Sequence, residues 1–460
     1  LIFADDFQGE SLNWKVWASQ AGPSGHILSS RWPENVVVRD GVLRLVTRKE
    51  RRAGQDWTTA NIWVKDRRFG YGYYEARYRY GAAPGLNNAF WLWKDLPGRA
   101  PGLVEIDINE GHYPDRINTN LHLHNDGRGR HYAVGQVYRA AGADLSRDFH
   151  TYGLEWNEQE LVYYFDGRPI RRLPNHIAFD GDMNLLLSTA VLAWAGRVTD
   201  ALDGTSMDVD WVRVYRRTAT QAPAVPQPAS LAGQTEAQPG GALRTLVHEE
   251  FEGSAPGTLP AGWRVLGGEP RVEASVSGME CFRMARHGNL AFVEAVRVAD
   301  PGEGGKHSLR LYHKEDVVLL PFPVQRQRVE VSFRVLLASP GSVLRAALVS
   351  PELEVAAGRG WVPLAGPYLG WHDLGYLGWY GEEAWHFFAA HPAGVWTTAR
   401  VTAEPASRRF AVYLGDGSLP AALGYFRAPQ EALGGLLFAK GEGRYGPEPV
   451  WIDNVRVRGR

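Results

Sequence analysis

The dominant pattern in this chain is a series of short runs in which apolar and polar residues alternate. Residues 74–80 (YEARYRY) and 329–335 (VEVSFRV) are two of them. A period of two is typical of half-buried strands. Turn dipeptides such as Asp40–Gly41 and Asp166–Gly167 separate the runs, and long segments with a helical period are missing. The pattern predicts an all-β chain made of sandwiches or jelly rolls.

Composition divides the 460 residues into two halves of similar size. Residues 218–241 are rich in Pro, Ala, Gln and Gly and contain no aromatic residue, which is typical of a linker. We therefore predict a β-jelly-roll sandwich domain over residues 1–217 and a second β-sandwich domain over residues 242–460. The ends of each half have a similar outline, which predicts that the first and last strands of each sandwich lie side by side.

Charge and composition exclude several classes of function. With 50 Lys+Arg against 51 Asp+Glu, the chain lacks the basic footprint of a nucleic-acid-binding protein. The chain contains no run of 18 or more apolar residues, so the sequence predicts no membrane span. The one cysteine, Cys281, rules out an internal disulfide. We expect no nucleic-acid or membrane partner, and a monomer.

The most informative segment is residues 104–110, Val-Glu-Ile-Asp-Ile-Asn-Glu. Alternation along a strand places Glu105 and Asp107 on one face. It would turn Glu110 toward the isoleucines, where a lone carboxylate is costly. A β-bulge near residues 108–109 would return Glu110 to the acidic face. The segment predicts three neighbouring carboxylates, although a solvated acidic face has the same spacing.

Such a bulge has a chemical consequence. With one residue taken up by the bulge, Glu105 and Glu110 are spaced like residues four apart in a regular strand. Such residues lie about 13 Å apart at Cα, from ~3.3 Å per residue. Glutamate side chains that lean together could bring the carboxyls of Glu105 and Glu110 to roughly 5–5.5 Å, as in retaining glycosidases. Asp107 between them would raise the pKa of one carboxyl, as a general acid needs at neutral pH. The preceding Trp91 and Trp93 share a face, either as sugar-stacking rings or as core.

The segment Glu105–Glu110 resembles the E-x-D-x-x-E signature of glycoside hydrolase family 16. Further blocks resemble the family in the same order, and together they cover about residues 1–217. These blocks are Asp5–Phe7, Ser30–Val36, Asp40–Leu43, Phe69–Arg77, His150–Trp156, Tyr164–Gly167 and Asp210–Tyr215.

The resemblance implies a jelly roll with an open cleft and a retaining endo-β-glycosidase that cleaves a β-1,3- or β-1,4-linked polysaccharide by double displacement. Glu105 would be the nucleophile, Glu110 the general acid and then the base, and Asp107 would tune both. No cofactor is required, but family members often carry a structural calcium away from the cleft, which would involve Asp210 and nearby backbone carbonyls. The resemblance also implies a secreted or cell-surface protein whose signal peptide has been removed.

The flanks of the motif bear on the substrate. The longer form of the signature resembles laminarinases, agarases and carrageenases, but Arg99–Val104 lacks the W-P pair of laminarinases and Asn109 replaces their Met. Arginine suits bidentate contact with sulfate or carboxylate groups; an ordinary charged loop has the same composition. The basic residues after the motif are Arg116, Arg128, Arg130 and His131.

We favour an algal galactan (agar, porphyran or carrageenan) over a β-glucan, with a β-1,3-glucanase (laminarinase) or a transglycosylase as alternatives. The non-enzymatic alternative is a two-module carbohydrate-binding protein.

His122 and His124 share a face of the next expected strand. In the family, a histidine on this strand often lies near the acid/base residue, which selects His122. Such a pair also suits zinc, but the sequence shows no third ligand. The remaining candidates for substrate contact are Arg31, Asn35, Trp156, Trp194 and Arg116.

The second half contains no comparable acidic group. Residues 370–380 are rich in aromatics and glycine, so they form either an exposed platform for sugars or buried packing. This half resembles concanavalin-like sandwiches appended to polysaccharide-degrading enzymes. It would then either bind carbohydrate, which raises the local enzyme concentration on an insoluble substrate, or serve only as structure.

Overall fold

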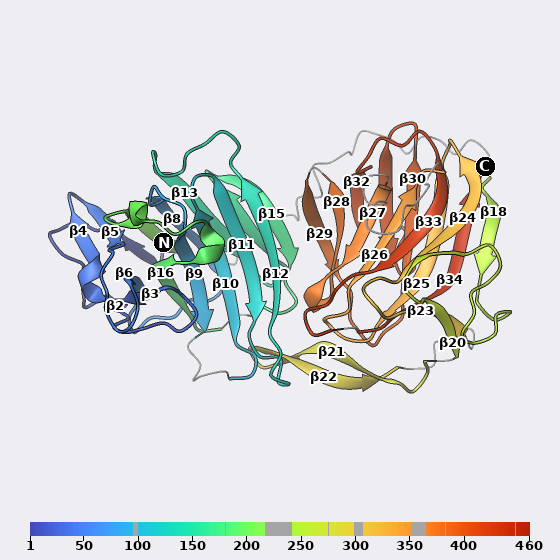
Figure 1. Ribbon diagram of the computed structural model, residues 1–460, viewed down its shortest axis with the longest axis horizontal. Helices are drawn as coiled ribbons and strands as arrows, with labels where there is room; N and C mark the ends of the chain where they lie inside the picture. The colour runs from blue at the N-terminus through green and yellow to red at the C-terminus, as the bar shows by residue number, and fades with distance from the viewer. Residues whose placement is uncertain are drawn as a thin grey trace. The chain divides into compact units, whose positions relative to one another are not determined.

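The computed structural model describes residues 1–94, 100–179, 181–216, 242–274, 276–298, 307–351, 365–381, 383–446 and 448–460 (Figure 1). The predicted linker, residues 218–241, lies outside the described residues. Strands joined by turns and a few short 3-10 segments make up the described parts, which contain no α-helix, so the all-β prediction is confirmed. None of their helical segments is long and apolar enough to span a membrane.

The chain forms two compact units. The first contains strands β1 to β17, and the second contains β18 to β34 except for Arg286–Phe292, which group with the first. Each unit has two large antiparallel sheets. Alternation sets the packing within a strand: in β8, Tyr74, Ala76 and Tyr78 are buried, whereas the residues between them are partly exposed.

One sheet of the first unit has the order β15-β14-β13-β8-β17-β5-β4, with β1 beside β17. Its strands are β1 (Phe3–Asp5), β4 (Val36–Arg39), β5 (Val42–Val46), β8 (Gly72–Arg79), β13 (His150–Trp156), β14 (Glu160–Phe165), β15 (Arg168–Pro174) and β17 (Ser206–Tyr215).

The other sheet of the first unit has the order β12-β11-β10-β9-β16-β7-β2. Its strands are β2 (Trp17–Ser19), β7 (Asn61–Val64), β9 (Leu86–Lys94), β10 (Val104–His112), β11 (Arg116–Leu123), β12 (Tyr132–Arg139) and β16 (Met183–Val191). The smaller elements are the parallel pair β3 (Ser29–Arg31) and β6 (Trp57–Thr59), with η1 (Pro33–Asn35), η2 (Ala193–Ala195) and η3 (Asp200–Leu202).

The second unit repeats the two-sheet plan. One sheet contains β18 (Arg244–Glu249), β20 (Arg271–Ala274), β23 (His307–Leu311), β25 (Val329–Leu337), β30 (Thr397–Glu404), β31 (Arg409–Leu414), β32 (Ala422–Tyr425) and β34 (Val450–Gly459). The other contains β19 (Arg264–Gly267), β24 (Val317–Gln325), β26 (Leu344–Val349), β27 (Ala365–Trp371), β28 (Tyr376–Gly381), β29 (Ala384–Ala390) and β33 (Leu433–Lys440). Outside them lie the ribbon β21 (Glu280–His287) with β22 (Leu290–Arg297), and η6 (Asp373–Gly375).

First and last strands pair in both units, as predicted. Ala4 of β1 lies opposite Arg213 of β17, and Glu249 of β18 lies opposite Val455 of β34. This pairing explains the similar outline of the sequence at the ends of the two halves.

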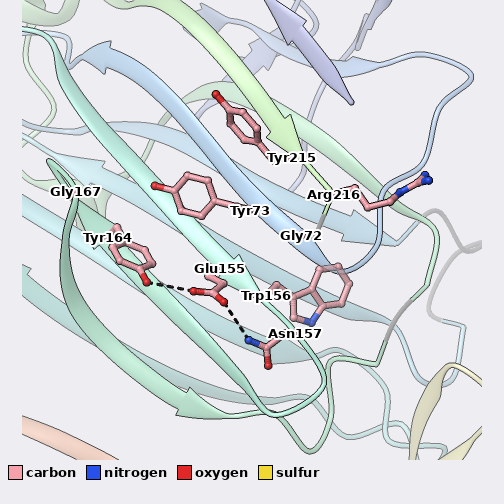
Figure 2. Close-up of a pocket in the computed structure, with 9 residues that line it drawn as sticks. All are labelled: Gly72, Tyr73, Glu155, Trp156, Asn157, Tyr164, Gly167, Tyr215 and Arg216. Atoms are coloured by element: carbon pink, nitrogen blue, oxygen red, sulfur yellow. Dashed lines mark hydrogen bonds between the residues drawn. The ribbon is translucent and has the colours of Figure 1, made fainter. Parts of the chain in front are cut away.

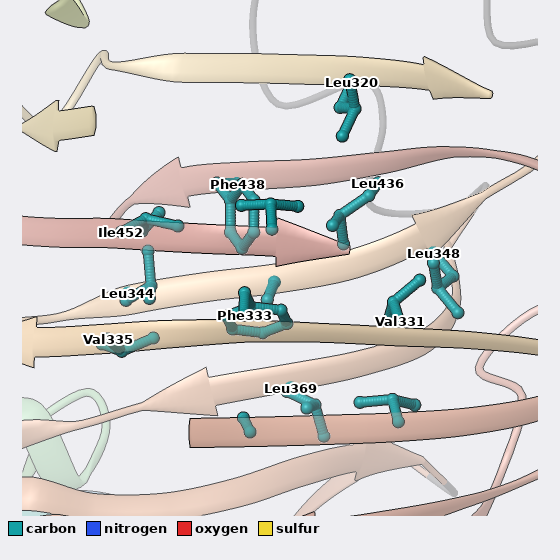
Figure 3. Packing of buried hydrophobic residues seen from close by; sticks show 14 of the residues in the cluster. Leu320, Val331, Phe333, Val335, Leu344, Leu348, Leu369, Leu436, Phe438 and Ile452 are labelled. Carbon is teal, nitrogen blue, oxygen red and sulfur yellow. The ribbon is translucent and has the colours of Figure 1, made fainter. Parts of the chain in front are cut away.

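The core of the second unit lies between its two sheets, where Phe333 and Phe438 meet edge to face at 4.9 Å between ring centroids (Figure 3). Trp371 and Tyr376, from the aromatic segment 370–380, are fully buried, and Trp379 is 8% exposed. These rings pack within the unit instead of forming an exposed platform.

Candidate active site

A β-bulge interrupts β10 between Asp107 and Glu110. Asp107 lies opposite Trp91 of β9 and Asn120 of β11, and Glu110 lies opposite Ala89 and Asn118. Both neighbouring strands therefore advance by two residues where β10 advances by three. The extra residue confirms the predicted bulge and restores the phase of the strand.

The bulge separates the carboxylates from the residue between them. Asn109 is fully buried, and its amide nitrogen donates hydrogen bonds to the hydroxyls of Tyr78 in β8 at 2.6 Å and of Tyr80, just after β8, at 2.9 Å. Ile108 is also buried. Glu110 faces the opposite side, where it lines a cavity together with Glu105 and Asp107.

This cavity has a volume of about 870 Å³ and lies on the face of its sheet that points away from the sandwich core. Five adjacent strands, β11, β10, β9, β16 and β7, line it. At about 4.8 Å between neighbouring strands, the lining spans roughly 19 Å. Its side chains include His122, Glu105, Trp93, Leu186 and Trp63.

Glu110 is held by two amides. Asn87 Nδ2 donates to its Oε1 at 2.8 Å and Asn120 Nδ2 donates to its Oε2 at 2.7 Å. Burial and the negative charge of Asp107 raise the pKa of Glu110 to about 8, against the opposing effect of the amide bonds. At neutral pH this carboxyl therefore carries a proton that it can donate.

Asp107 forms an ion pair with His122. His122 Nε2 lies 3.1 Å from Asp107 Oδ2. Burial and the charge of Glu105 raise the pKa of Asp107 to about 6. Burial alone would lower the pKa of His122, but its hydrogen bond to Asp107 and the surrounding carboxylates raise that pKa to about 9. A carboxylate and an imidazolium therefore face each other at pH 7.

Glu105 has different neighbours. Its Oε2 accepts a hydrogen bond from His124 Nε2, and Trp93 and His122 lie opposite it on the flanking strands. Arg31 also lines the cavity at 8% exposure. Burial lowers the pKa of Arg31 to about 10, partly offset by the charge of Glu105, so the guanidinium remains charged.

Aromatic rings and polar atoms complete the lining. Trp91 and Trp93 meet edge to face at 6.0 Å between centroids, and Trp91 Nε1 donates to Ser188 Oγ at 3.1 Å. Trp194 in η2 is 57% exposed at the same cavity. Several buried polar atoms of the lining lack a hydrogen-bond partner among the described residues: Arg31 Nε, Asn61 Oδ1, Asn87 Oδ1 and Asn184 Oδ1.

Some of the predicted contact residues do not line this cavity. Asn35 is fully buried, and its amide donates to the Val46 carbonyl at 2.8 Å and to Thr58 Oγ1 at 3.0 Å. It fixes η1 to neighbouring segments. Arg116 begins β11 and is exposed outside the cavity lining, as is Arg128; Arg130 is partly buried and also lies outside the lining.

Trp156 belongs to the opposite sheet. It is 1% exposed, its Nε1 donates to the Ala178 carbonyl at 2.8 Å, and it lines a separate pocket of about 340 Å³ (Figure 2). Glu155 in the same pocket accepts hydrogen bonds from Tyr164 and Asn157. The structure thus separates Trp156 from the carboxylates that it was predicted to accompany.

The predicted calcium ligand, Asp210, forms an ion pair with Arg77. A cation at this carboxylate would have to displace the guanidinium. A calcium site built from Asp210 and nearby backbone carbonyls stays a prediction.

Sequence reasoning missed Asn87 and Asn120, which hold Glu110. A pairing argument could have found them, because both strands flank β10 and carry Asn on the face of Trp91 and His122. It also missed Tyr78 and Tyr80, whose hydroxyls accept the bonds from Asn109.

The fold and the cavity together define the class: a jelly-roll protein with an acidic, aromatic-lined groove across one sheet. The model of the family "Glycosyl hydrolases family 16" matches residues 28–213. The beta-glucanase of Rhodothermus marinus is 31% identical over 246 residues, which cover 47% of this chain and 85% of that protein. The chain belongs to glycosyl hydrolases family 16.

Two other relatives differ in their names. The endo-1,3-1,4-beta-glycanase EglC of Rhizobium meliloti is 31% identical over 215 residues, 45% of this chain and 43% of that protein. The beta-porphyranase B of Zobellia galactanivorans is 24% identical over 242 residues, 46% of this chain and 82% of that protein. The match therefore spans less than half of the Rhizobium protein.

Proposed function

We propose that this chain is a retaining endo-β-glycosidase that cleaves a β-1,3- or β-1,4-linked polysaccharide. The observation that carries the proposal is the bulge in β10, which brings Glu105, Asp107 and Glu110 into one cavity with different neighbours. Two carboxyl groups in different protonation states are what acid-assisted cleavage of a glycosidic bond requires.

In the first step, the Glu105 carboxylate attacks the anomeric carbon and Glu110 donates its proton to the departing oxygen. The pKa of about 8 keeps Glu110 protonated at neutral pH. A covalent glycosyl–enzyme intermediate forms as the glycosidic bond breaks. In the second step, Glu110 accepts a proton from water, whose oxygen attacks the anomeric carbon and releases Glu105.

Asp107 links the two glutamates. Its negative charge raises the pKa of Glu110, and its ion pair with His122 keeps Asp107 in place. His122 in turn lies opposite Glu105 on β11. We infer that Asp107 tunes the two catalytic residues and does not itself form a bond to the sugar.

The groove supports cleavage within a polymer. Its lining spans five strands, with carboxylates near one end and Asn61 and Trp63 of β7 near the other. A polymer of this kind is met outside the cell, which supports a secreted or cell-surface location.

A β-glucan is the substrate we propose first. The arginines that favoured a charged galactan, Arg116, Arg128 and Arg130, do not line the cavity, where Arg31 is the one arginine among the described lining residues. Beta-glucanases are also named among the relatives. A galactan remains the second candidate, because another relative is a beta-porphyranase.

The test measures new reducing ends on laminarin, mixed-linkage glucan, agarose, porphyran and carrageenans. We expect cleavage of at least one glucan, with NMR showing that the new anomeric centre keeps the β configuration. Inversion would exclude the double displacement. Binding without hydrolysis of any substrate would instead favour a carbohydrate-binding protein.

Two variants separate the roles of the glutamates. Glu105→Gln should abolish turnover but retain polysaccharide binding. Hydrolysis by this variant would show that Glu105 is not the nucleophile. Glu110→Ala should act best on substrates with a good leaving group. Added azide should then trap the intermediate as a glycosyl azide of retained configuration.

A further inference from the structure

Three histidines gather beside the catalytic carboxylates. His122 lies on β11, His124 directly follows this strand, and His131 directly precedes β12. One ring nitrogen from each lies within 4.8 Å of the other two. His122 Nδ1 and His131 Nε2 are only 3.0 Å apart. His131 places a third imidazole beside the pair that the sequence showed.

We propose that His122, His124 and His131 form a binding site for a divalent transition-metal ion of the class of Zn²⁺. Neutral imidazole suits zinc, copper and nickel. Two imidazoles at about 2.05 Å from a tetrahedral ion have their nitrogens about 3.3 Å apart. The separation of His122 Nδ1 and His131 Nε2 is close to this value. An ion between them would replace the proton that they now share.

The carboxylates form the second layer of such a site. His122 Nε2 bonds to Asp107 and His124 Nε2 bonds to Glu105. An imidazole that donates one N–H to a carboxylate has its tautomer fixed and its other nitrogen left as the metal ligand. The hydrogen bonds from these rings to carboxylates are therefore of the kind that orients metal-binding histidines in proteins.

The rings have to turn before the ion can bind. All three are stacked in pairs, with 9° between the planes of His124 and His131, 21° between His122 and His124, and 28° between His122 and His131, whereas a metal ion lies in the plane of each imidazole that binds it. His131 lies outside the hydrogen-bonded ladder of β11 and β12, which ends at Tyr132. Its ring can turn without breaking a backbone bond of the sheet, and it would exchange its present bond to His122 for a bond to the ion.

A metal ion here would inhibit the activity proposed above. His122 and His124 line the substrate cavity, so the ion would occupy space needed by the sugar. The imidazole of His124 would also connect the ion to Glu105, and that of His122 would connect it to Asp107. The positive charge of the ion would make the Glu105 carboxylate a weaker nucleophile. The inhibition depends on the proposed function, but the binding does not.

Binding is tested by calorimetric titration of the full chain with ZnCl₂, and in parallel with NiCl₂. We expect one equivalent of ion. His131→Asn should weaken binding by at least about 10-fold, since even the loss of an outer-layer partner costs 10–100-fold. The matched control is His26→Asn, because His26 lines the same cavity but is not one of the three histidines. This variant should bind zinc with the same affinity as the wild type.

Equal zinc affinity of the wild type and His131→Asn would overturn the proposal, as would a failure of the wild type to bind. X-ray absorption of the zinc-loaded wild type provides a check that needs no variant: three imidazole ligands are expected, and two or fewer would refute the site. If the hydrolase activity is present, zinc should abolish it, EDTA should restore it, and His131→Asn should require at least about 10-fold more zinc for inhibition.

Discussion

Deletion of Asn109 should leave Glu110 in the cavity. Without this residue, Ile108 would take the place opposite Phe90, and Asp107 and Glu110 would keep their present partners on β9 and β11. The strand would then alternate regularly, with its carboxylates on one face. The deletion should therefore be tolerated, although it falls between the two glutamates that we propose as catalytic residues.

The cost of the deletion can be estimated from the bonds of Asn109. Its amide donates to Tyr78 and Tyr80, but Tyr80 keeps a second bond, to the Arg116 carbonyl at 3.2 Å. The main loss is the donor to the buried Tyr78 hydroxyl, worth roughly 1–3 kcal/mol. Removal of the unpartnered Asn109 Oδ1 offsets part of it. In a unit of this size, 1 kcal/mol lowers Tm by about 2–4 °C.

The assay compares the deletion with Asn109→Ala, which removes the same amide but keeps the bulge. Both variants should lose similar stability in thermal melts. The deletion should retain kcat/KM to within about 100-fold, the effect of a 1 Å displacement of a catalytic group. Glu110→Gln, in contrast, should lose about 10²–10⁴-fold in kcat/KM because it has no proton to donate.

A folded deletion variant with no hydrolysis, beside an active Asn109→Ala, would refute the reasoning. It would mean that the bulge shapes the distance between the carboxyls and does more than set the phase of the strand. An unfolded deletion variant beside a stable Asn109→Ala would show that β10 cannot pair regularly with its neighbours.

Three further predictions concern the first unit. kcat/KM should fall as the pH rises through about 8, where Glu110 loses its proton, and Asp107→Asn should move this limb to lower pH by removing a negative charge; a pH–rate profile with an unchanged limb would contradict it. Arg171→Met should lower the unfolding free energy in urea by roughly 2–4 kcal/mol, because the buried guanidinium bonds to carbonyls of β11 and β12. Trp194→Ala should raise KM several-fold and leave kcat nearly unchanged if the exposed ring only binds sugar; a fall in kcat alone would exclude that role.

The bulge could be predicted because the sequence contains a conflict. Regular alternation would have buried the Glu110 carboxylate among isoleucines, and one extra residue resolves this at small cost. The strand pairing at the ends of each unit could be predicted because the first and last segments of the two halves have a similar outline. A sequence pattern is informative where it leaves only one face of a strand on which a residue can lie at low cost.

Asn35 and Trp156 show where such reasoning stops. Nothing near Asn35 in the sequence distinguishes an amide that faces a groove from one that bonds to the Val46 carbonyl and the Thr58 hydroxyl. Trp156 lies in an alternating strand, but alternation does not say which of the two sheets contains that strand. Those contacts join segments distant in sequence, and only the fold reveals them.

One strand supplies both proposed catalytic glutamates, so their different roles must come from neighbouring elements. Glu110 lies among neutral amides and beside the charge of Asp107, which raises its pKa and suits a proton donor. Glu105 instead accepts a bond from His124 and faces the charge of Arg31, which suits an anionic nucleophile. Exchange of the roles would require the amides and the cationic groups to change places, which their fixed positions on β9, β11 and β3 prevent.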